Sequence, residues 1–252
     1  MTQTMQSLLV GFIFFMSALT LLGTWKRPNR YGRYMRDGQP RTVPALAGWL
    51  LFESPQLCAF ALAFWLTASD PSPVAVGLFV VWQAHYVHRA VLYPLRRNDK
   101  GKRFPVGGVV AGVLFNSING VINGWAVVHA EHLMSTGWLT DGRFIVGAIS
   151  FVIGWGINFQ ADSILIGLRG DGSTGYKIPY GGAFRWVSAA NYFGEIVMWT
   201  GWAVMTWTAA GLSFAAFTTA NLLPRALSHH RWYRKTFPAY PPERRAVFPW
   251  LL

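Results

Sequence analysis

Seven apolar runs account for most of the 252-residue chain. Each is near or above the roughly 20 residues that an α-helix needs to cross the hydrocarbon core of a bilayer. The runs fall at about 5–24, 44–68, 73–95, 105–130, 143–168, 186–207 and 209–227. This pattern predicts an all-α integral membrane protein with seven transmembrane helices.

The first run is expected to be a retained helix rather than a removable signal peptide. No Lys or Arg precedes Lys26, so the basic n-region of a signal peptide is missing, and no A-x-A-like cleavage site is present. The chain has no internal repeat, no low-complexity stretch and no long Pro/Gly/Ser linker. Residues 1–252 are therefore expected to form one domain.

Basic residues alternate between the connections that join these runs. Six lie within 26–41, five within 96–103, three within 169–185 and six within 225–245. The connections between these, around Asp70, from Glu131 to Asp141 and near residue 208, contain none. Cytoplasmic loops accumulate Lys and Arg. The alternation predicts an exported N-terminus and a cytoplasmic C-terminus, in either a bacterial inner membrane or the endoplasmic reticulum.

Composition narrows the class of protein further. The chain is 52% hydrophobic and 13% charged, with a net charge of +12. In a soluble protein this charge would suggest nucleic-acid binding, but here the basic residues gather on one membrane face, so we expect no nucleic-acid partner. Two explanations remain open for these basic residues: they set the membrane topology, or they also bind an anionic ligand on that face. The lone cysteine, Cys58, excludes a disulfide framework and a Cys-based metal site.

Ionisable groups inside the apolar runs are informative, because each is destabilising by several kcal/mol unless it faces a partner or a cavity. Glu53 lies within the second run. Asn158 and Asp162 share one helical face at a spacing of four, and Asn191 and Glu195 repeat the pattern in the sixth run. Polar groups of this kind either join helices or serve a function. Three buried acids together favour a function.

Two further polar groups stand out in the third and fourth runs. The third contains a cluster of ionisable and aromatic residues, namely His85, Tyr86, His88 and Arg89. The fourth carries Asn116, Asn119 and Asn123 on one helical face. This amide face is not expected to contact lipid, and both helix packing and function remain open for it. Each histidine alone is interpreted as a packing residue.

Several motifs do not support the function that their letters suggest. Gly170 to Gly175 matches G-x-G-x-x-G, but it follows a membrane helix rather than a strand, so it is not a dinucleotide-binding turn of the Rossmann type. His229 and His230 lack the H-x-x-H-H boxes of membrane desaturases, so no metal is expected. There is no G-x-S-x-G elbow for a covalent acyl mechanism.

Longer motifs occur in order along nearly the whole chain. They are Tyr31-Gly32, Phe52-Glu53-Ser54-Pro55, His85-Tyr86-Val87-His88-Arg89, Gly156-Ile157-Asn158 to Asp162, Tyr176-Lys177-Ile178-Pro179-Tyr180-Gly181-Gly182, Ala190-Asn191-Tyr192-Phe193-Gly194-Glu195, and Arg225-Ala226 to His229-His230-Arg231-Trp232-Tyr233. In sequence and spacing this set resembles the steroid 5α-reductase family, and within it most closely the type 2 branch. These are polytopic membrane enzymes that reduce a conjugated enone with NADPH.

The resemblance implies a pocket within the bundle, open toward the cytoplasmic face, that holds NADPH beside the enone of a 3-keto-Δ4 steroid. The catalytic pair of the family corresponds to Glu53 and Tyr86, which would hydrogen-bond the ketone oxygen. A preorganised phenol supported by a carboxyl group would stabilise the charge that builds on this oxygen. Hydride addition to the β-carbon and protonation of the α-carbon complete the reduction.

The resemblance also implies a set of residues for the cofactor. Those around the nicotinamide and ribose are Asn158, Asp162, Tyr176, Asn191 and Glu195. Those that close the site are Arg225, His229 and Tyr233, and those that meet the phosphates are Arg169, Lys177 and Lys102 or Arg103. Guanidinium and ammonium groups suit the extra phosphate of NADPH. Tyr31 corresponds to a further position near the cofactor.

One departure from the family leaves the substrate open. Phe52 occupies a position that is often Gln in the family, so a hydrogen bond to substrate is lost there. The alternatives are a reductase of another enoyl or polyprenol lipid, a membrane methyltransferase that uses S-adenosylmethionine, and a sterol-binding or transport protein. Dependence on a nicotinamide cofactor would separate the reductases from the others. The oligomeric state is not predicted.

Overall fold

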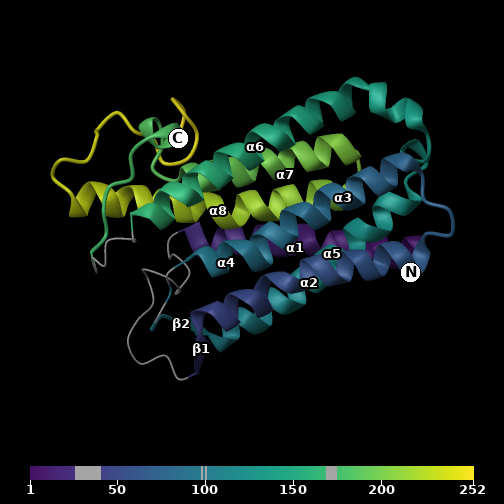
Figure 1. Ribbon diagram of the computed structural model, residues 1–252, viewed down its shortest axis with the longest axis horizontal. Helices are drawn as coiled ribbons and strands as arrows, with labels where there is room; N and C mark the ends of the chain where they lie inside the picture. The colour runs from purple at the N-terminus through teal and green to yellow at the C-terminus, as the bar shows by residue number, and fades with distance from the viewer. Residues whose placement is uncertain (26–40, 98, 100, 169–174) are drawn as a thin grey trace.

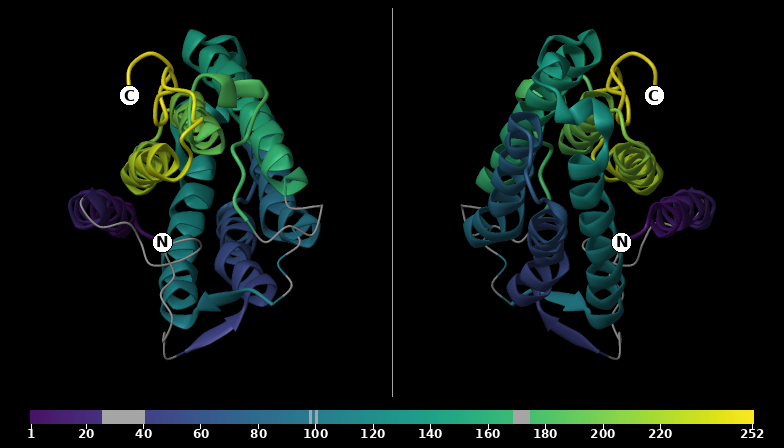
Figure 2. Two further views of the ribbon diagram at one scale, coloured as in Figure 1. Left: turned by 90° about the vertical axis from the view of Figure 1, so that its left-hand side faces the viewer. Right: turned by 90° about the vertical axis from the view of Figure 1, so that its right-hand side faces the viewer.

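The computed structural model describes residues 1–25, 41–97, 99, 101–168 and 175–252, and within these ranges seven helical rods form one elongated bundle (Figure 1). Six rods are single α-helices: α1 (Gln3–Trp25), α2 (Ala45–Thr67), α5 (Val106–His129), α6 (Gly142–Gly167), α7 (Ala190–Thr206) and α8 (Ala209–Thr236). Helix α1 lies at the outer edge of the bundle, beside α8 (Figure 2). The predicted all-α class is confirmed.

The remaining rod is composite. It consists of α3 (Pro73–Val87), a π-helical turn η2 (His88–Leu92) and α4 (Tyr93–Arg96). Ser72 starts it as the N-cap, accepting a hydrogen bond from the backbone N–H of Ala75, with Pro73 in the first turn. Single π-helical turns inside α-helices are frequent at functional sites. The turn η2 contains Arg89, which proves central below.

Short elements complete the described chain. Strands β1 (Thr42–Pro44) and β2 (Arg103–Pro105) pair antiparallel at the starts of α2 and α5. The short 3-10 turns are η3 (Glu131–Met134), η4 (Thr136–Thr140) and η5 (Gly182–Arg185). The β1–β2 pair, the end of α8 and the C-terminus lie at one end of the bundle, and the N-terminus lies at the other (Figure 1). Among the described basic residues, Arg103 in β2 and Arg234 and Lys235 in the last turn of α8 lie at the end that holds the C-terminus.

Two predicted boundaries differ from the structure. The helix expected over 186–207 begins at Ala190, because the residues before it pair with the C-terminal segment: Val187 forms a bridge with Arg245, and the backbone N–H of Ser188 donates to the carbonyl oxygen of Arg245 at 2.8 Å. The helix expected over 209–227 continues to Thr236 as a polar extension. Hydropathy alone detects neither, because backbone pairing and polar helical turns leave no apolar signal.

Four of the described helices are long and apolar enough to cross a membrane by length and composition, and the protein is a multi-pass membrane protein on this basis. They are α1, α2, α5 and α6. The uninterrupted α-helices α3 and α7 have 15 and 17 residues. Helix α8 carries Asn221, Pro224 and Arg225 within its length. The seven-span arrangement therefore remains a proposal.

Glycines bring α6 and α7 into backbone contact. Gly147 on α6 faces Gly201 on α7, and Gly154 on α6 faces Gly194 on α7. The two glycines of each helix are seven residues apart in the sequence. A Cβ atom added at Gly154 would overlap the backbone N of Met198 and the carbonyl oxygen of Gly194. Small residues allow this close approach in membrane helix pairs. The two helices are thus held against each other along their length.

Substitution of Gly154 by Leu is expected to destabilise the protein, because overpacking at a helix contact is unfavourable by about 1–3 kcal/mol. The matched control is Gly156→Leu on the same helix, where an added Cβ would meet nothing within 4 Å. The measurement is thermal unfolding in detergent, followed by tryptophan fluorescence. Equal melting temperatures for the two variants would contradict the backbone contact.

A row of amides joins α2 to α5. The side-chain amide of Asn116 donates to the carbonyl oxygen of Phe52, and the Gln56 amide donates to Asn116 Oδ1 at 2.9 Å. Asn119 donates to Gln56 Oε1 at 3.3 Å, and Asn123 donates to Asn119 Oδ1 at 3.1 Å. All three asparagines are buried. The prediction that this face avoids lipid is confirmed, and for Asn119 and Asn123 the observed role is packing.

Aromatic rings fill the core beside these amides. The cluster includes Phe60, Phe64, Trp82, Trp199, Trp202 and Phe214. Phe60 stacks on Trp82 with ring centroids 4.5 Å apart, and Trp82 contacts Trp202 at 4.9 Å. The indole N–H of Trp202 donates to Asn123 Oδ1 at 3.0 Å. Tyr86 contacts Trp82 at 5.1 Å and lies where this core meets a cavity.

Candidate active site

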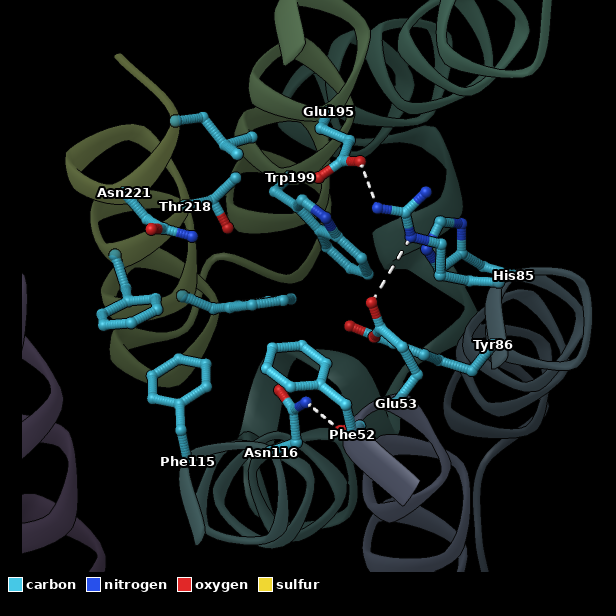
Figure 3. A pocket seen from close by; sticks show the side chains of 14 residues that line it. Phe52, Glu53, His85, Tyr86, Phe115, Asn116, Glu195, Trp199, Thr218 and Asn221 are labelled. Carbon is cyan, nitrogen blue, oxygen red and sulfur yellow. Dashed lines mark hydrogen bonds and ion pairs between the residues drawn. The ribbon is translucent and has the colours of Figure 1, made fainter. Parts of the chain in front are cut away.

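A cavity lies among α2, the α3–η2 rod, α5, α7 and α8 (Figure 3). One side of it is ionisable and is lined by Glu53, His85, Tyr86, Arg89 and Glu195. Most of the remaining wall is aromatic or aliphatic and is lined by Phe52, Phe115, Trp199, Phe214, Phe217 and Leu222. Asn116, Thr218 and Asn221 complete the lining. The cavity thus combines an apolar chamber with one strongly polar side.

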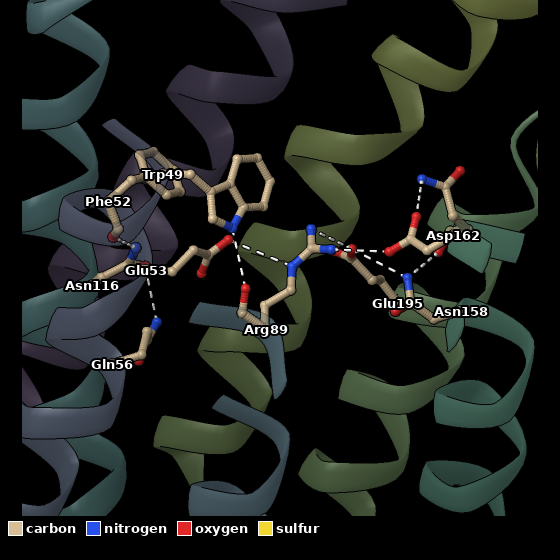
Figure 4. Close-up of polar contacts among 10 residues, drawn as sticks. Trp49, Phe52, Glu53, Gln56, Arg89, Asn116, Asn158, Asp162 and Glu195 are labelled. Carbon is tan, nitrogen blue, oxygen red and sulfur yellow. Dashed lines mark hydrogen bonds and ion pairs between the residues drawn. The ribbon is translucent and has the colours of Figure 1, made fainter. Parts of the chain in front are cut away.

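The guanidinium of Arg89 is the centre of the polar side. Its Nε lies 3.5 Å from Glu53 Oε1, its Nη1 lies 3.1 Å from Asp162 Oδ2, and its Nη2 lies 2.9 Å from Glu195 Oε1 (Figure 4). These carboxyl groups come from α2, α6 and α7. One buried cation therefore joins three helices that are far apart in the sequence. This arginine–carboxylate cluster, Arg89 with Glu53, Asp162 and Glu195, orients all three acids.

Aromatic side chains and the π-helical turn hold Arg89 in this position. The indole N–H of Trp49 on α2 donates to the carbonyl oxygen of Arg89 at 3.1 Å. The guanidinium carbon lies 5.0 Å from the ring centre of Trp49 and 4.9 Å from that of Tyr93. Cation–π contacts of this kind strengthen as water is excluded. Arg89 is therefore fixed before any ligand binds.

The two predicted amide–carboxylate ridges meet beside this cluster. Asn158 Nδ2 donates to the carbonyl oxygen of Asn191 at 3.0 Å and to Glu195 Oε1 at 3.3 Å. Asn191 Nδ2 donates to Asp162 Oδ1 at 3.3 Å. The close packing of α6 on α7 makes this possible, because a Cβ at Gly194 would overlap the backbone of Asn158. The four side chains form one hydrogen-bonded group.

Glu53 and Tyr86 open on the same cavity. Tyr86 is 3% exposed, and its hydroxyl makes no hydrogen bond within the described part of the chain. Its ring stacks on Trp199 at 5.8 Å and meets the edge of His85 at 4.9 Å. His85 packs as expected from the sequence, and it also lines the cavity. The phenol is thus oriented by its neighbours, with its donor available to a ligand.

The predicted phosphate residues lie nearer the end that holds the C-terminus. Lys102 Nζ pairs with Asp99 Oδ1 at 3.1 Å, and Arg103 Nε donates to Thr42 Oγ1 at 3.0 Å. Both line a second cavity, between the β1–β2 pair and α4, together with Arg97. Two further predicted positions, Tyr31 and Arg169, lie outside the described residues.

The other predicted cofactor residues lie around the last turns of α8. Tyr176 is exposed and meets the ring of Trp232 at 5.2 Å, and Lys177 follows it in the chain. The guanidinium of Arg225 lies 5.8 Å from the ring centre of Tyr192, whose hydroxyl is 3.2 Å from His229 Nε2. Tyr233 is buried and stacks on Tyr240 at 5.3 Å. Their roles at the cofactor remain predictions.

The sequence interpretation did not assign a role to Arg89, the residue that organises the site. The signal was present, because three acids in apolar runs require a buried cation. Arg89 lies within the run 73–95, three residues after Tyr86. The sequence did not show that Arg89 pairs with Glu53, Asp162 and Glu195, because these acids come from three different helices.

Fold and site together define a class: a multi-pass membrane protein whose buried ionisable cluster borders an apolar cavity, as in enzymes that act on lipid-soluble molecules. Residues 102–252 match the family model described as 3-oxo-5-alpha-steroid 4-dehydrogenase. The chain belongs to this enzyme family, the steroid 5α-reductases.

Individual relatives match over almost the whole chain. A steroid 5-alpha-reductase of Solanum lycopersicum is 39% identical over 96% of this chain and 95% of its own length. The 3-oxo-5-alpha-steroid 4-dehydrogenase 2 of Homo sapiens is 37% identical over 89% of each chain. The human type 1 protein is 38% identical over 88% of this chain and 85% of its own length. The sequence analysis expected the type 2 branch. Because the identities to the type 1, type 2 and plant enzymes are similar, the comparisons do not single out that branch.

Proposed function

We propose that this protein reduces the Δ4 double bond of 3-keto steroids with NADPH, as a 3-oxo-5α-steroid 4-dehydrogenase. The observation that carries the proposal is the pair Tyr86 and Glu53, a phenol and a carboxyl group that line one apolar cavity. Both are buried. Membership of the family supports the same reaction. A phenol and a carboxyl group in a water-poor cavity can polarise a ketone by hydrogen bonds to its oxygen.

In the proposed reaction, Tyr86 donates a hydrogen bond to the ketone oxygen of the enone, and Glu53, in its protonated form, donates a second one from α2. Negative charge develops on the ketone oxygen as the β-carbon is reduced, and a fixed donor in a water-poor cavity stabilises it. When bound, NADPH supplies the hydride for the β-carbon. The α-carbon then takes up a proton, so the double bond gains two hydrogens in all.

Arg89 is proposed to act as a positioning residue. Its Nε lies 3.5 Å from Glu53 Oε1, which orients this acid, and the same guanidinium holds Asp162 and Glu195. The substrate-facing acid and the two acids on α6 and α7 therefore keep fixed relative positions. Preorganisation of this kind avoids reorganisation at the moment of reaction.

The residues present suit NADPH. Asn158, Asp162, Asn191 and Glu195 form a hydrogen-bonded group of donors and acceptors beside the cavity, which fits a carboxamide and a ribose. Cationic side chains that fit phosphates lie beside the β1–β2 pair and along α8: Lys102 and Arg103 line the second cavity, Arg225 lies on α8, and Lys177 follows Tyr176, which contacts Trp232 of α8. Tyr31, Arg169, Tyr176, His229 and Tyr233 are proposed to complete the set. An elongated dinucleotide would extend from the cavity toward the basic end.

The proposed topology has seven transmembrane helices in one domain, residues 1–252, that enclose the cofactor and substrate pocket. The N-terminus is proposed to be exported and the C-terminus cytoplasmic. Support comes from the alternation of basic residues between connections in the sequence, and from Arg103 in β2 and Arg234 and Lys235 in the last turn of α8, which lie at the end with the C-terminus. Lys and Arg mark the cytoplasmic side of membrane proteins. NADPH would then reach its site from the cytoplasm.

The test is steroid turnover by the purified protein in detergent, with testosterone or progesterone and either NADPH or NADH. A product heavier by two hydrogens, formed with NADPH and not with NADH, is expected. NADPH binding without steroid reduction would instead support a reductase of another enoyl or polyprenol lipid. Absence of both signals would contradict the proposal and favour a methyltransferase or a transport protein.

A further inference from the structure

Buried serine and threonine hydroxyls in this bundle follow one pattern. Each of five such residues on the described helices donates to a backbone carbonyl about one turn earlier, which satisfies the hydroxyl without a ligand. The pairs are Ser17 with Ile13, Thr24 with Thr20, Thr206 with Trp202, Ser213 with Ala210, and Ser228 with Pro224. Buried Ser72 and Ser188, which lie outside the helices, are also hydrogen-bonded.

Thr218 on α8 is the exception among the described residues. Its side chain lines the cavity, the residue is only 6% exposed, and its hydroxyl has no hydrogen-bond partner within the ranges described. Its neighbour Thr219 follows the pattern and donates to the carbonyl oxygen of Ala215 at 2.9 Å. The hydroxyl itself is not among the fully buried unpaired atoms, so it is accessible from the cavity and free to hydrogen-bond a molecule there. Its position on the cavity wall indicates that a bound molecule supplies the partner.

The location of Thr218 indicates which part of a bound molecule it meets. In Figure 3, Thr218 and Asn221 lie on α8, across the cavity from Glu53 and Tyr86. The wall between these two sides is mainly aromatic and includes Phe115, which stacks on Phe217 with ring centroids 3.8 Å apart. The cavity therefore offers hydrogen bonds at two opposite sides and apolar contact between them.

We infer that Thr218 recognises an oxygen substituent at the end of the substrate opposite the enone, and so selects steroids that carry such a group. The inference rests on the proposed function, because the enone is assigned to the side of Glu53 and Tyr86. A site built to hydrogen-bond a substrate hydroxyl discriminates against the analogue that lacks it, since its own polar group is then left unpaired.

The test uses Thr218→Val, which replaces the hydroxyl by a methyl group of similar shape. Thr219→Val is the matched control, because its hydroxyl is satisfied within the helix. The two substrates are testosterone, which carries a hydroxyl group opposite its enone, and its deoxy analogue. Thr218→Val is expected to raise KM for testosterone about 10-fold, the loss of one hydrogen bond. KM for the deoxy analogue, KM for NADPH, and kcat should not change, and Thr218→Ser should retain the preference.

Four results would overturn the inference. An equal loss with both steroids, including in Thr218→Ser, would assign Thr218 to packing. A raised KM for NADPH with an unchanged KM for testosterone would assign the hydroxyl to the cofactor. Failure of the wild-type protein to reduce either steroid would reject the proposed function, and the inference with it. Turnover of both steroids with no preference would reject the inference alone.

Discussion

Tyr86→Phe is expected to lower kcat by about two to three orders of magnitude, because a donor aimed at a developing oxyanion contributes on this scale. Glu53→Gln should show a comparable loss, since it removes the acid that faces the same oxygen. Neither change removes a member of the group formed by Asn158, Asp162, Asn191 and Glu195, and Arg89 keeps its pairs with Asp162 and Glu195, so NADPH should still bind. Single-turnover kinetics and NADPH fluorescence measure the two effects separately.

Tyr180→Phe provides the control, because Tyr180 is 59% exposed and does not line the cavity. It removes the same hydroxyl from the surface and should leave kcat unchanged. Wild-type turnover in Tyr86→Phe would contradict the assignment of the phenol to the ketone. A loss of NADPH binding in either cavity variant would show that the residue supports the cofactor instead.

Arg89→Met is expected to destabilise the protein strongly. Removing one partner of a buried ion pair is unfavourable by about 3–5 kcal/mol, and here one cation is paired with three carboxyl groups. The melting temperature in detergent should fall well below that of Arg143→Met, which breaks an exposed pair with Asp141. Exposed pairs contribute little.

A compensating variant tests whether Arg89 stabilises the protein through its carboxyl partners. Adding Asp162→Asn and Glu195→Gln to Arg89→Met removes two of the unpaired carboxylates. Part of the lost stability should therefore return, because sites in direct contact are not additive. Activity should stay low in this triple variant, since Glu53 is no longer held. Equal melting of Arg89→Met and Arg143→Met would contradict the cluster as described.

The features of the fold that repeat along the chain could be predicted from the sequence. Apolar runs gave seven helices, and spacings of four gave the ridges of Asn158 with Asp162 and Asn191 with Glu195. The start of α7 was misplaced because the residues before Ala190 pair with the segment at Arg245, and the end of α8 was misplaced because its last turns are polar; hydropathy reports neither feature.

Features that depend on contact between helices could not be predicted. Gly154 and Gly194 look like ordinary residues of apolar runs, and their role follows only from the facing backbone. The three partners of Arg89 come from three helices. Thr218 cannot be told from Thr219 in the sequence, although one hydroxyl is satisfied and the other is not.

The glycine contacts have a mechanical consequence. Gly154 with Gly194 holds α6 to α7, and Gly124 with the backbone of Phe60 holds α5 to α2, so each pair moves as one stiff body. Widening of the cavity between Glu53 on α2 and Glu195 on α7 would then separate the two pairs along the seam between them. Arg89 spans that seam, with Glu53 on one side and Asp162 and Glu195 on the other. Relative motion of the two helix pairs is thus coupled to the position of the Arg89 guanidinium. A ligand that moves one pair inward would therefore shift the carboxyl groups on the other pair.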